Sequence, residues 1–239
     1  MGLQGQRVVV VGGTSGIGLA VAEGAAREGA DVVVASRRQE NVDAALKVLP
    51  EGAWGRVLDA TDEEAVRGFF AAVGGYDHLV FTAGDALLLA TVAETSVEAA
   101  RRFLDTRLFG AYTVVKQGVG SIRPGGSVVL TTGTAGQRPL PGSSVASALC
   151  GAMESLTRAL AVELAPVRVN VVSPGVVRTD LWRTLPEAAR EELYRSSAES
   201  LPVGRMGEPA DVAEAYLYLM RGGYSTGSVV VVDGGGTLV

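Results

Sequence analysis

The chain has 239 residues, of which 47% are hydrophobic and 20% charged, and its formal net charge is −5. This composition is typical of a globular protein with an ample core, and the acidic balance gives no broad attraction to nucleic acid or anionic membranes. No Pro/Ser-rich linker, repeat or charge block divides the chain, so we expect one domain over residues 1–239.

The cysteine and histidine content and the apolar stretches of the chain exclude further classes of protein. Cys150 is the only cysteine and His78 the only histidine, so no internal disulfide can form and no metal site is indicated. The longest apolar-leaning stretch, residues 79–93, is interrupted by Asp85 and is too short to cross a bilayer. The start of the chain lacks the pattern of a signal peptide. We therefore expect a soluble, cytoplasmic protein without a metal.

A run of four valines, residues 8–11, leads directly into a glycine-spaced turn and then into a helical pattern. Such a run is typical of a strand buried on both faces, and the following apolar residues share one helical stripe. Gly12 would allow the sharp turn, Gly16 a close approach of the backbone to a pyrophosphate, and Gly18 close packing of the helix on the sheet. We expect a dinucleotide to contact Gly12, Thr14, Ser15, Gly16, Ile17 and Gly18. The spacing Gly-x3-Gly-x-Gly differs from the usual Gly-x-Gly-x-x-Gly, and a tight turn without a ligand is the alternative.

A second buried strand, residues 31–36, ends in Ser36 and is followed by Arg37 and Arg38. An NAD-binding protein usually offers a carboxylate here to the ribose 2′-hydroxyl, whereas arginines suit the 2′-phosphate of NADP. The sequence therefore favours NADP(H) over NAD(H). The alternative is that both arginines are solvated at the start of a helix over residues 39–49.

Strands and helices alternate along the rest of the chain. We expect strands at 54–58, 78–82, 126–131, 167–172 and 228–232, and helices at 62–73, 96–118, 143–164 and 209–220. This alternation predicts an α/β fold, a three-layer sandwich of parallel βαβ units. Asp59 and the pair Ala83-Gly84 directly follow strands, at the edge where ligands bind in such sheets. His78 would lie at the opposite edge, away from any chemistry.

With these elements in order, the sequence resembles the short-chain dehydrogenase/reductase family along its whole length. The resemblance is carried by Gly12-x3-Gly16-Ile17-Gly18, Asp59, Ala83-Gly84, the Val-Asn-Val-Val-Ser-Pro-Gly segment at 169–175 and the Val-Asp-Gly-Gly segment at 232–235. It implies a Rossmann-like, seven-stranded, mainly parallel sheet with helices on both faces and a nicotinamide cofactor across the strand ends. It also implies a homodimer or homotetramer joined through residues 96–118, 143–164 and 228–239.

The resemblance also assigns positions along the cofactor. It places Asp59 and Ala60 near the adenine, Ala83 and Gly84 along the cofactor, and Pro174, Gly175, Val177 and Thr179 around the nicotinamide. One departure is visible here, because Phe81 and Thr82 stand where the family usually has two asparagines.

A larger departure concerns catalysis. The family uses a serine after the fifth strand, a tyrosine and a lysine four residues apart on the next helix, and an asparagine on the helix before. These positions hold Gly133, Ala146, Cys150 and Arg107, and residues 133–155 contain no tyrosine or lysine. Positioned proton transfer contributes about 10²–10⁴ in rate and an oxyanion donor about 10²–10³, so we expect ordinary carbonyl reduction to be very slow.

Three functions remain compatible with these substitutions. The first is a reductase whose substrate needs no proton from the protein, such as an iminium ion, or which recruits nearby hydroxyls from Ser143 and Thr131. The second is an NADP(H)-binding partner of an active homologue, and the third is a lyase or isomerase that reuses the pocket. Arg107 is the one candidate catalytic residue; it would bind an anionic oxygen rather than donate a proton, unless it faces the surface. Cys150 is either a nucleophile or a small apolar filler.

Overall fold

The structure is a computed structural model that describes residues 2–183 and 185–239. Its strands form one seven-stranded sheet in the order β3-β2-β1-β4-β5-β6-β7. All pairings between neighbouring strands are parallel. The strands are β1 (Arg7–Val11), β2 (Asp31–Ser36), β3 (Trp54–Val57), β4 (Tyr76–Phe81), β5 (Ile122–Thr131), β6 (Arg168–Pro174) and β7 (Val229–Val232). The predicted Rossmann-like fold is confirmed, with a fully parallel sheet.

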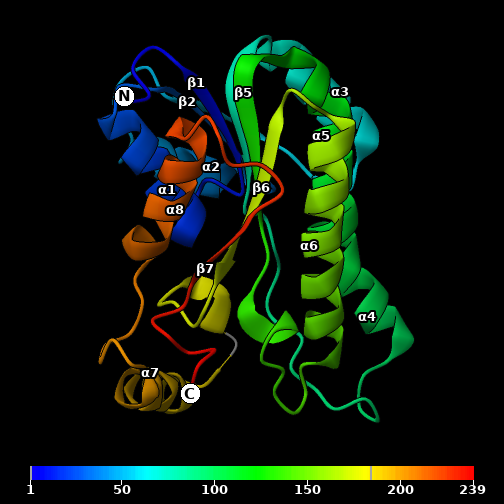
Figure 1. Cartoon of the computed structure of the whole chain (residues 1–239), viewed down its shortest axis with the longest axis vertical. Helices are drawn as coiled ribbons and strands as arrows, with labels where there is room; N and C mark the ends of the chain where they lie inside the picture. The colour runs from blue at the N-terminus through cyan, green and yellow to red at the C-terminus, as the bar shows by residue number, and fades with distance from the viewer. Residues whose placement is uncertain (1, 184) are drawn as a thin grey trace.

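Helices cover both faces of the sheet (Figure 1). One face carries α1 (Gly16–Arg27), α2 (Gln39–Leu46) and α8 (Pro209–Arg221); the other carries α3 (Glu63–Val73), α4 (Val97–Leu104), α5 (Gly110–Gly118) and α6 (Ser144–Glu163). The valine run of β1 serves both layers, because Val8 and Val10 pack on the α1 side while Val9 and Val11 pack on the other. An uninterrupted apolar strand is therefore what the centre of this sheet requires.

Two segments differ from the sequence-based expectation. The single helix expected over 96–118 is divided into α4, a π-helical turn (Asp105–Phe109) and α5. A further helix, α7 (Glu187–Ser200), was not predicted, because its residues are mostly polar and only Tyr194 among them is buried. The sequence pattern of α7 lacks the apolar stripe on which helix prediction depends.

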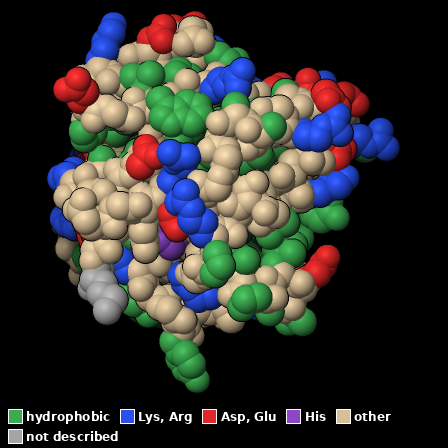
Figure 2. All heavy atoms as spheres, turned by 90° about the horizontal axis from the view of Figure 1, so that it is seen from above, with side chains coloured by type: hydrophobic (Ala, Val, Ile, Leu, Met, Phe, Trp, Pro, Cys, Tyr) green, Lys and Arg blue, Asp and Glu red, His purple; other side chains and the backbone are tan. Residues whose placement is uncertain are grey.

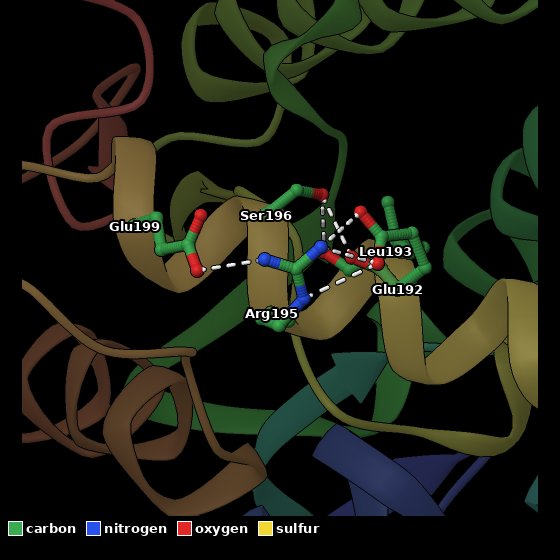
Figure 3. Close-up of polar contacts among 5 residues, drawn as sticks. All are labelled: Glu192, Leu193, Arg195, Ser196 and Glu199. Carbon is green, nitrogen blue, oxygen red and sulfur yellow. Dashed lines mark hydrogen bonds and ion pairs between the residues drawn. The ribbon is translucent and has the colours of Figure 1, made fainter.

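Helix α7 lies below the carboxyl-terminal edge of the sheet, near the C-terminus (Figure 1). Within the helix, Arg195 bonds Glu192 one turn before it at 2.6 Å and Glu199 one turn after it at 2.9 Å (Figure 3). Tyr194 points inward, and the guanidinium of Arg178 lies 4.3 Å from its ring centroid. The helix therefore combines a charged outer face with one aromatic anchor.

The opposite, amino-terminal edge of the sheet carries interspersed acidic and basic side chains (Figure 2). His78 is buried at this end of β4, where its ring nitrogens lie 2.9 Å from Ser127 Oγ and 2.9 Å from Gln6 Oε1. Both ring nitrogens are therefore used in structural hydrogen bonds, far along the strand from the edge where the glycine turn lies.

Among the described helices, only α6 is long and apolar enough to cross a bilayer by length and composition. Residues 79–93, the apolar-leaning stretch judged too short to cross a bilayer from the sequence, comprise the end of β4 and a loop. Helix α6 packs on the sheet through Leu149, Met153 and Leu160, all buried. This packing is that of a core helix in a globular domain.

Candidate active site

The glycine turn after β1 packs directly against the end of β4. Gly12 adopts φ +90°, and a Cβ placed there would lie 2.5 Å from the backbone nitrogen of Ala83. A Cβ at Gly18 would overlap the carbonyl oxygen of Gly12, so the start of α1 lies on the turn. Thr82, at a position where the family usually has asparagine, donates its hydroxyl to Gly12 O at 3.2 Å. The turn is therefore fixed by backbone contacts that leave no room for side chains.

The first turn of α1 is free to bind an anion. Its N-cap, Ser15, makes no side-chain cap hydrogen bond, and no acidic residue lies in the first turn. The N–H groups of a helix's first turn have no partner within the helix, and the dipole favours negative charge there. The residues of this turn therefore fit the pyrophosphate of a dinucleotide.

A cavity of about 750 Å³ runs along the carboxyl-terminal edge of the sheet. The predicted cofactor residues that line it are Gly12, Thr14, Ser15, Gly16, Ile17, Gly18, Ser36, Arg37, Arg38, Ala60, Ala83, Gly84, Pro174, Gly175, Val177 and Thr179. Asp59 is the exception: its carboxylate accepts from the backbone nitrogen and hydroxyl of Thr61, at 2.9 Å and 2.7 Å. Asp59 thus stabilises its own turn, while its neighbour Ala60 faces the cavity.

Gly133, Ala146, Cys150 and Arg107, which the resemblance assigned to the family's catalytic positions, line the same cavity. A Cβ at Gly133 would lie 3.5 Å from Cys150 Sγ, an ordinary van der Waals contact. The end of β5 and the first turns of α6 therefore meet at the cavity, and the wall they form carries small side chains.

The nearby hydroxyls that the sequence suggested as substitute donors are already engaged. Thr131 Oγ1 donates to Phe81 O at 2.6 Å and lies 2.7 Å from Tyr216 Oη, which therefore donates to it. Ser143 Oγ donates to Leu140 O at 2.6 Å and accepts from Leu140 N at 2.9 Å. In the structure each hydroxyl hydrogen is used within the protein, which argues against the suggestion that these hydroxyls are recruited as donors.

Arg107 points into the molecule from the π-helical turn, so the surface-facing alternative is wrong. Its guanidinium lies 4.3 Å from the ring centroid of Phe103, and a Cβ at Gly84 would lie 3.0 Å from its Nη2. Nη2 donates to the backbone oxygen of Asp85, while buried Nη1 has no hydrogen-bond partner among the described residues. Burial lowers the pKa of Arg107 to about 10, against the opposing charge of Asp85. The side chain therefore remains a cation at neutral pH, with one donor unused.

Asp85 is a site residue that the sequence analysis missed. Its carboxylate pairs with Arg37 through Oδ1 and accepts from Thr106 Oγ1 through Oδ2 at 2.8 Å. Burial would raise the pKa of Asp85, but the hydrogen bonds from Thr106 and Arg37 and the charges of Arg37 and Arg107 lower it. The available signal was an acidic residue directly after Ala83-Gly84, inside an otherwise apolar stretch.

Comparison with known proteins identifies the family. The family model described as Enoyl-(Acyl carrier protein) reductase matches residues 11–237. A curated relative, Short-chain dehydrogenase/reductase ATR9 of Stachybotrys chlorohalonatus, is 35% identical over 256 aligned positions, which cover 99% of this chain and 98% of that protein. The chain belongs to the short-chain dehydrogenase/reductase (SDR) family.

Solved SDR structures share the whole fold. MalC Reductase/Diels-Alderase from Malbranchea aurantiaca superposes with a TM-score of 0.92 at 32% identity, covering 99% of this chain and 98% of that one. A small-chain dehydrogenase in complex with NADPH gives a TM-score of 0.84 at 33% identity, covering 99% of this chain and 100% of that one. An NADPH-bound short chain oxidoreductase from Pseudomonas aeruginosa PAO1, described as containing an atypical catalytic center, gives 0.88 at 31% identity over 96% of both chains. The NADPH in two of these structures agrees with the NADP(H) prediction.

Proposed function

We propose that this chain is an NADP(H)-dependent oxidoreductase with an altered active site, acting on substrates that need no proton from the protein. The observation that carries the proposal is the wall formed by Gly133, Ala146 and Cys150, none of which replaces a tyrosine–lysine proton donor. The engaged hydroxyls of Thr131 and Ser143 support it, since neither offers a free hydrogen.

The cofactor is NADP(H), which when bound supplies or accepts the hydride. The chain's own contribution is to hold and orient it. The free N–H groups at the start of α1 would bind the pyrophosphate, and the guanidinium groups of Arg37 and Arg38 would bind the 2′-phosphate.

Arg107 is the residue that meets the substrate in this proposal. Its guanidinium, which lines the cavity, would stabilise through its charge an oxygen on which negative charge develops, as happens when hydride adds to the β-carbon of a conjugated carbonyl. The resulting enolate then takes a proton at carbon from water, so no protein acid is needed. The fixed cation favours this class over an iminium ion, whose positive charge it would repel. The iminium ion suggested by the sequence remains the alternative substrate.

A substrate panel tests the function. Purified protein and NADPH are incubated with simple ketones, conjugated enones and preformed cyclic iminium ions, while NADPH absorbance is followed. We expect NADPH to bind, enones to be reduced and ketones to remain unreacted. Brisk ketone reduction would contradict the altered site. Binding of NADPH without turnover of any substrate would instead favour the role of a non-catalytic partner, and co-purification with a complete SDR homologue would support that role.

A non-redox activity in the same pocket is the second candidate. It is favoured by the similarity to MalC, whose name combines a reductase with a Diels-Alderase. An apolar side of the cavity, lined by Leu87, Leu89, Phe103, Leu140 and Leu149, would suit the folded carbon skeleton of a cyclising substrate. Product formation without NADPH consumption would support this activity.

A cytoplasmic location also stays a prediction, and fractionation of host cells would test it.

A further inference from the structure

Asp85 contacts two arginines: Arg37, which is expected to bind the cofactor, and Arg107, which is expected to meet the substrate. Arg37 follows β2 and Asp85 follows β4, and these strands flank β1 with its glycine turn. The Arg37–Asp85 ion pair therefore reaches across the end of β1, and both residues line the cavity predicted to hold the dinucleotide. Arg107 contacts the same residue from the other side, through the backbone oxygen of Asp85.

The carboxylate is held in this place rather than swinging freely. Thr106 donates to Oδ2 at 2.8 Å, and Thr106 itself is buried in the π-helical turn. The side chains of Arg37 and Asp85 are 51% and 40% exposed, so a ligand that enters the cavity can reach both partners. The guanidinium expected to bind the 2′-phosphate is thus paired with a protein carboxylate in this structure.

We propose that Asp85 is a cofactor-selectivity residue, which competes with the 2′-phosphate of NADP(H) for the guanidinium of Arg37. The inference rests on the proposed binding of that phosphate by Arg37. A phosphate dianion replaces the carboxylate as partner of Arg37, while the uncharged 2′-hydroxyl of NAD(H) has no charge with which to do so. Asp85 therefore weakens the binding of NADP(H) and leaves that of NAD(H) unchanged, so the ratio of the two affinities is smaller than it would be without the carboxylate.

Binding measurements test this without any turnover. The dissociation constants of NADPH and NADH are measured by calorimetry for the unaltered protein, Asp85→Asn, Arg37→Ala and the double variant. Asp85→Asn keeps the shape and can still accept from Thr106. We expect it to tighten NADPH about two- to fivefold, the range for a half-exposed ion pair, and to leave NADH nearly unchanged. In the Arg37→Ala background, the same substitution should lose this effect, because the one guanidinium that Asp85 pairs with is gone.

Two further variants test whether a change in NADPH affinity comes from the Arg37–Asp85 pair or only from a change in the net charge of the protein. Asp43→Asn removes the same charge from α2, where the carboxylate bonds only Gln39 among the described residues and does not line the cavity; NADPH affinity should not change. Thr106→Val leaves every charge in place but removes the bond that holds Oδ2. It should tighten NADPH by a smaller factor than Asp85→Asn, and it provides a second test if that variant folds poorly.

The outcomes are distinguishable. Weaker NADPH binding in Asp85→Asn would mean that Asp85 organises Arg37 instead of competing for it, and would overturn the proposal. An equal shift for NADPH and NADH would overturn it too, as would a tightening that persists without Arg37. If Arg37→Ala leaves NADPH affinity unchanged, the assignment of the 2′-phosphate to Arg37 is wrong and the Asp85 proposal fails with it. If Arg37→Ala weakens NADPH while Asp85→Asn changes nothing, only the proposal for Asp85 fails.

Discussion

Tyr216 Oη lies 2.7 Å from Thr131 Oγ1, so a phenol buried in α8 supports a hydroxyl at the rim of the cavity. The Thr131 hydroxyl donates its hydrogen bond to Phe81 O at 2.6 Å, so it has no free hydrogen to donate to a substrate. The pair is therefore a structural link between α8 and the ends of β4 and β5.

Removing one partner of this link should destabilise the protein without changing its chemistry. Thr131→Val leaves the buried Tyr216 hydroxyl unpaired, which costs about 1–3 kcal/mol of unfolding free energy, while kcat should be unchanged. The double variant Thr131→Val/Tyr216→Phe should recover much of that loss, because both polar groups are then gone. Urea denaturation and steady-state kinetics check both points. A large fall in kcat for Thr131→Val, with unchanged stability, would make Thr131 a participant in the reaction.

Arg107 should act differently on the two substrate classes. With a conjugated carbonyl, Arg107→Ala removes the cation beside the developing oxyanion, and kcat should fall about 10²-fold. With an iminium substrate, Arg107 acts only through binding, and KM should rise more than kcat falls. Phe103→Leu is the matched control, since it removes the ring beneath the guanidinium and keeps the charge. Equal kinetics for Arg107→Ala and the unaltered protein with every substrate would exclude Arg107 from the site.

Restoring the family's residues should create ketone reductase activity. The variant Gly133→Ser/Ala146→Tyr/Cys150→Lys supplies an oxyanion donor and a tyrosine–lysine pair along one cavity wall. In the parent chain, a Cβ at Gly133 would meet only ordinary contacts, 3.5 Å to Cys150 Sγ and 3.9 Å to Pro174 O. We expect the rate with a simple ketone to rise by at least about 10²-fold over the parent chain. The variant Gly133→Ser alone is the control, and it should gain little because it lacks the proton donor.

His78 should make stability depend on pH below neutrality. Burial, with the charge of Arg168, lowers the pKa of His78 to about 4, although the charge of Asp77 opposes the shift. The unfolded chain has the ordinary value near 6.5, so between pH 6.5 and 4 the unfolded state binds a proton that the folded state does not. Unfolding free energy should therefore fall by about 3 kcal/mol as the pH drops through this window. Urea unfolding at several pH values measures the slope. His78→Gln should have a shallower slope, and an identical slope in both proteins would contradict the assignment.

The proposed homodimer or homotetramer has apolar surface available on the predicted helices. Phe109 at the end of the π-helical turn and Tyr112 in α5 are 57% and 50% exposed, and Val162 near the end of α6 is 81% exposed. Light scattering at micromolar concentration should give a dimeric or tetrameric mass. The variant Phe109→Glu/Tyr112→Glu should shift the protein toward monomer, while Val48→Glu, on an exposed site beyond α2, should not. A monomeric mass for the unaltered protein would refute the proposed assembly.

Much of this architecture follows from local sequence pattern. A strand buried on both faces must be apolar at every position, so the valines of β1 predict a central parallel strand without knowledge of their neighbours. The glycine turn was recognisable because glycine alone tolerates the conformation of Gly12 and its contact with Ala83. Helix α7 was missed because its stability rests on one buried tyrosine and local ion pairs, which leave no periodic signal.

The sequence by itself determined the fold and the absence of a tyrosine or lysine side chain at Gly133, Ala146 and Cys150, and it predicted the place of the cofactor site, since these depend on residue identity and local pattern. Only the tertiary structure decided how the polar groups of the site are shared. Arg37 and Asp85 are 48 residues apart and Thr131 and Tyr216 are 85 apart. Their pairing depends on which strand ends and helix faces the fold brings together, and no local periodicity records that. For the same reason, the inward direction of Arg107 follows from the π-helical turn and the Phe103 ring beneath it.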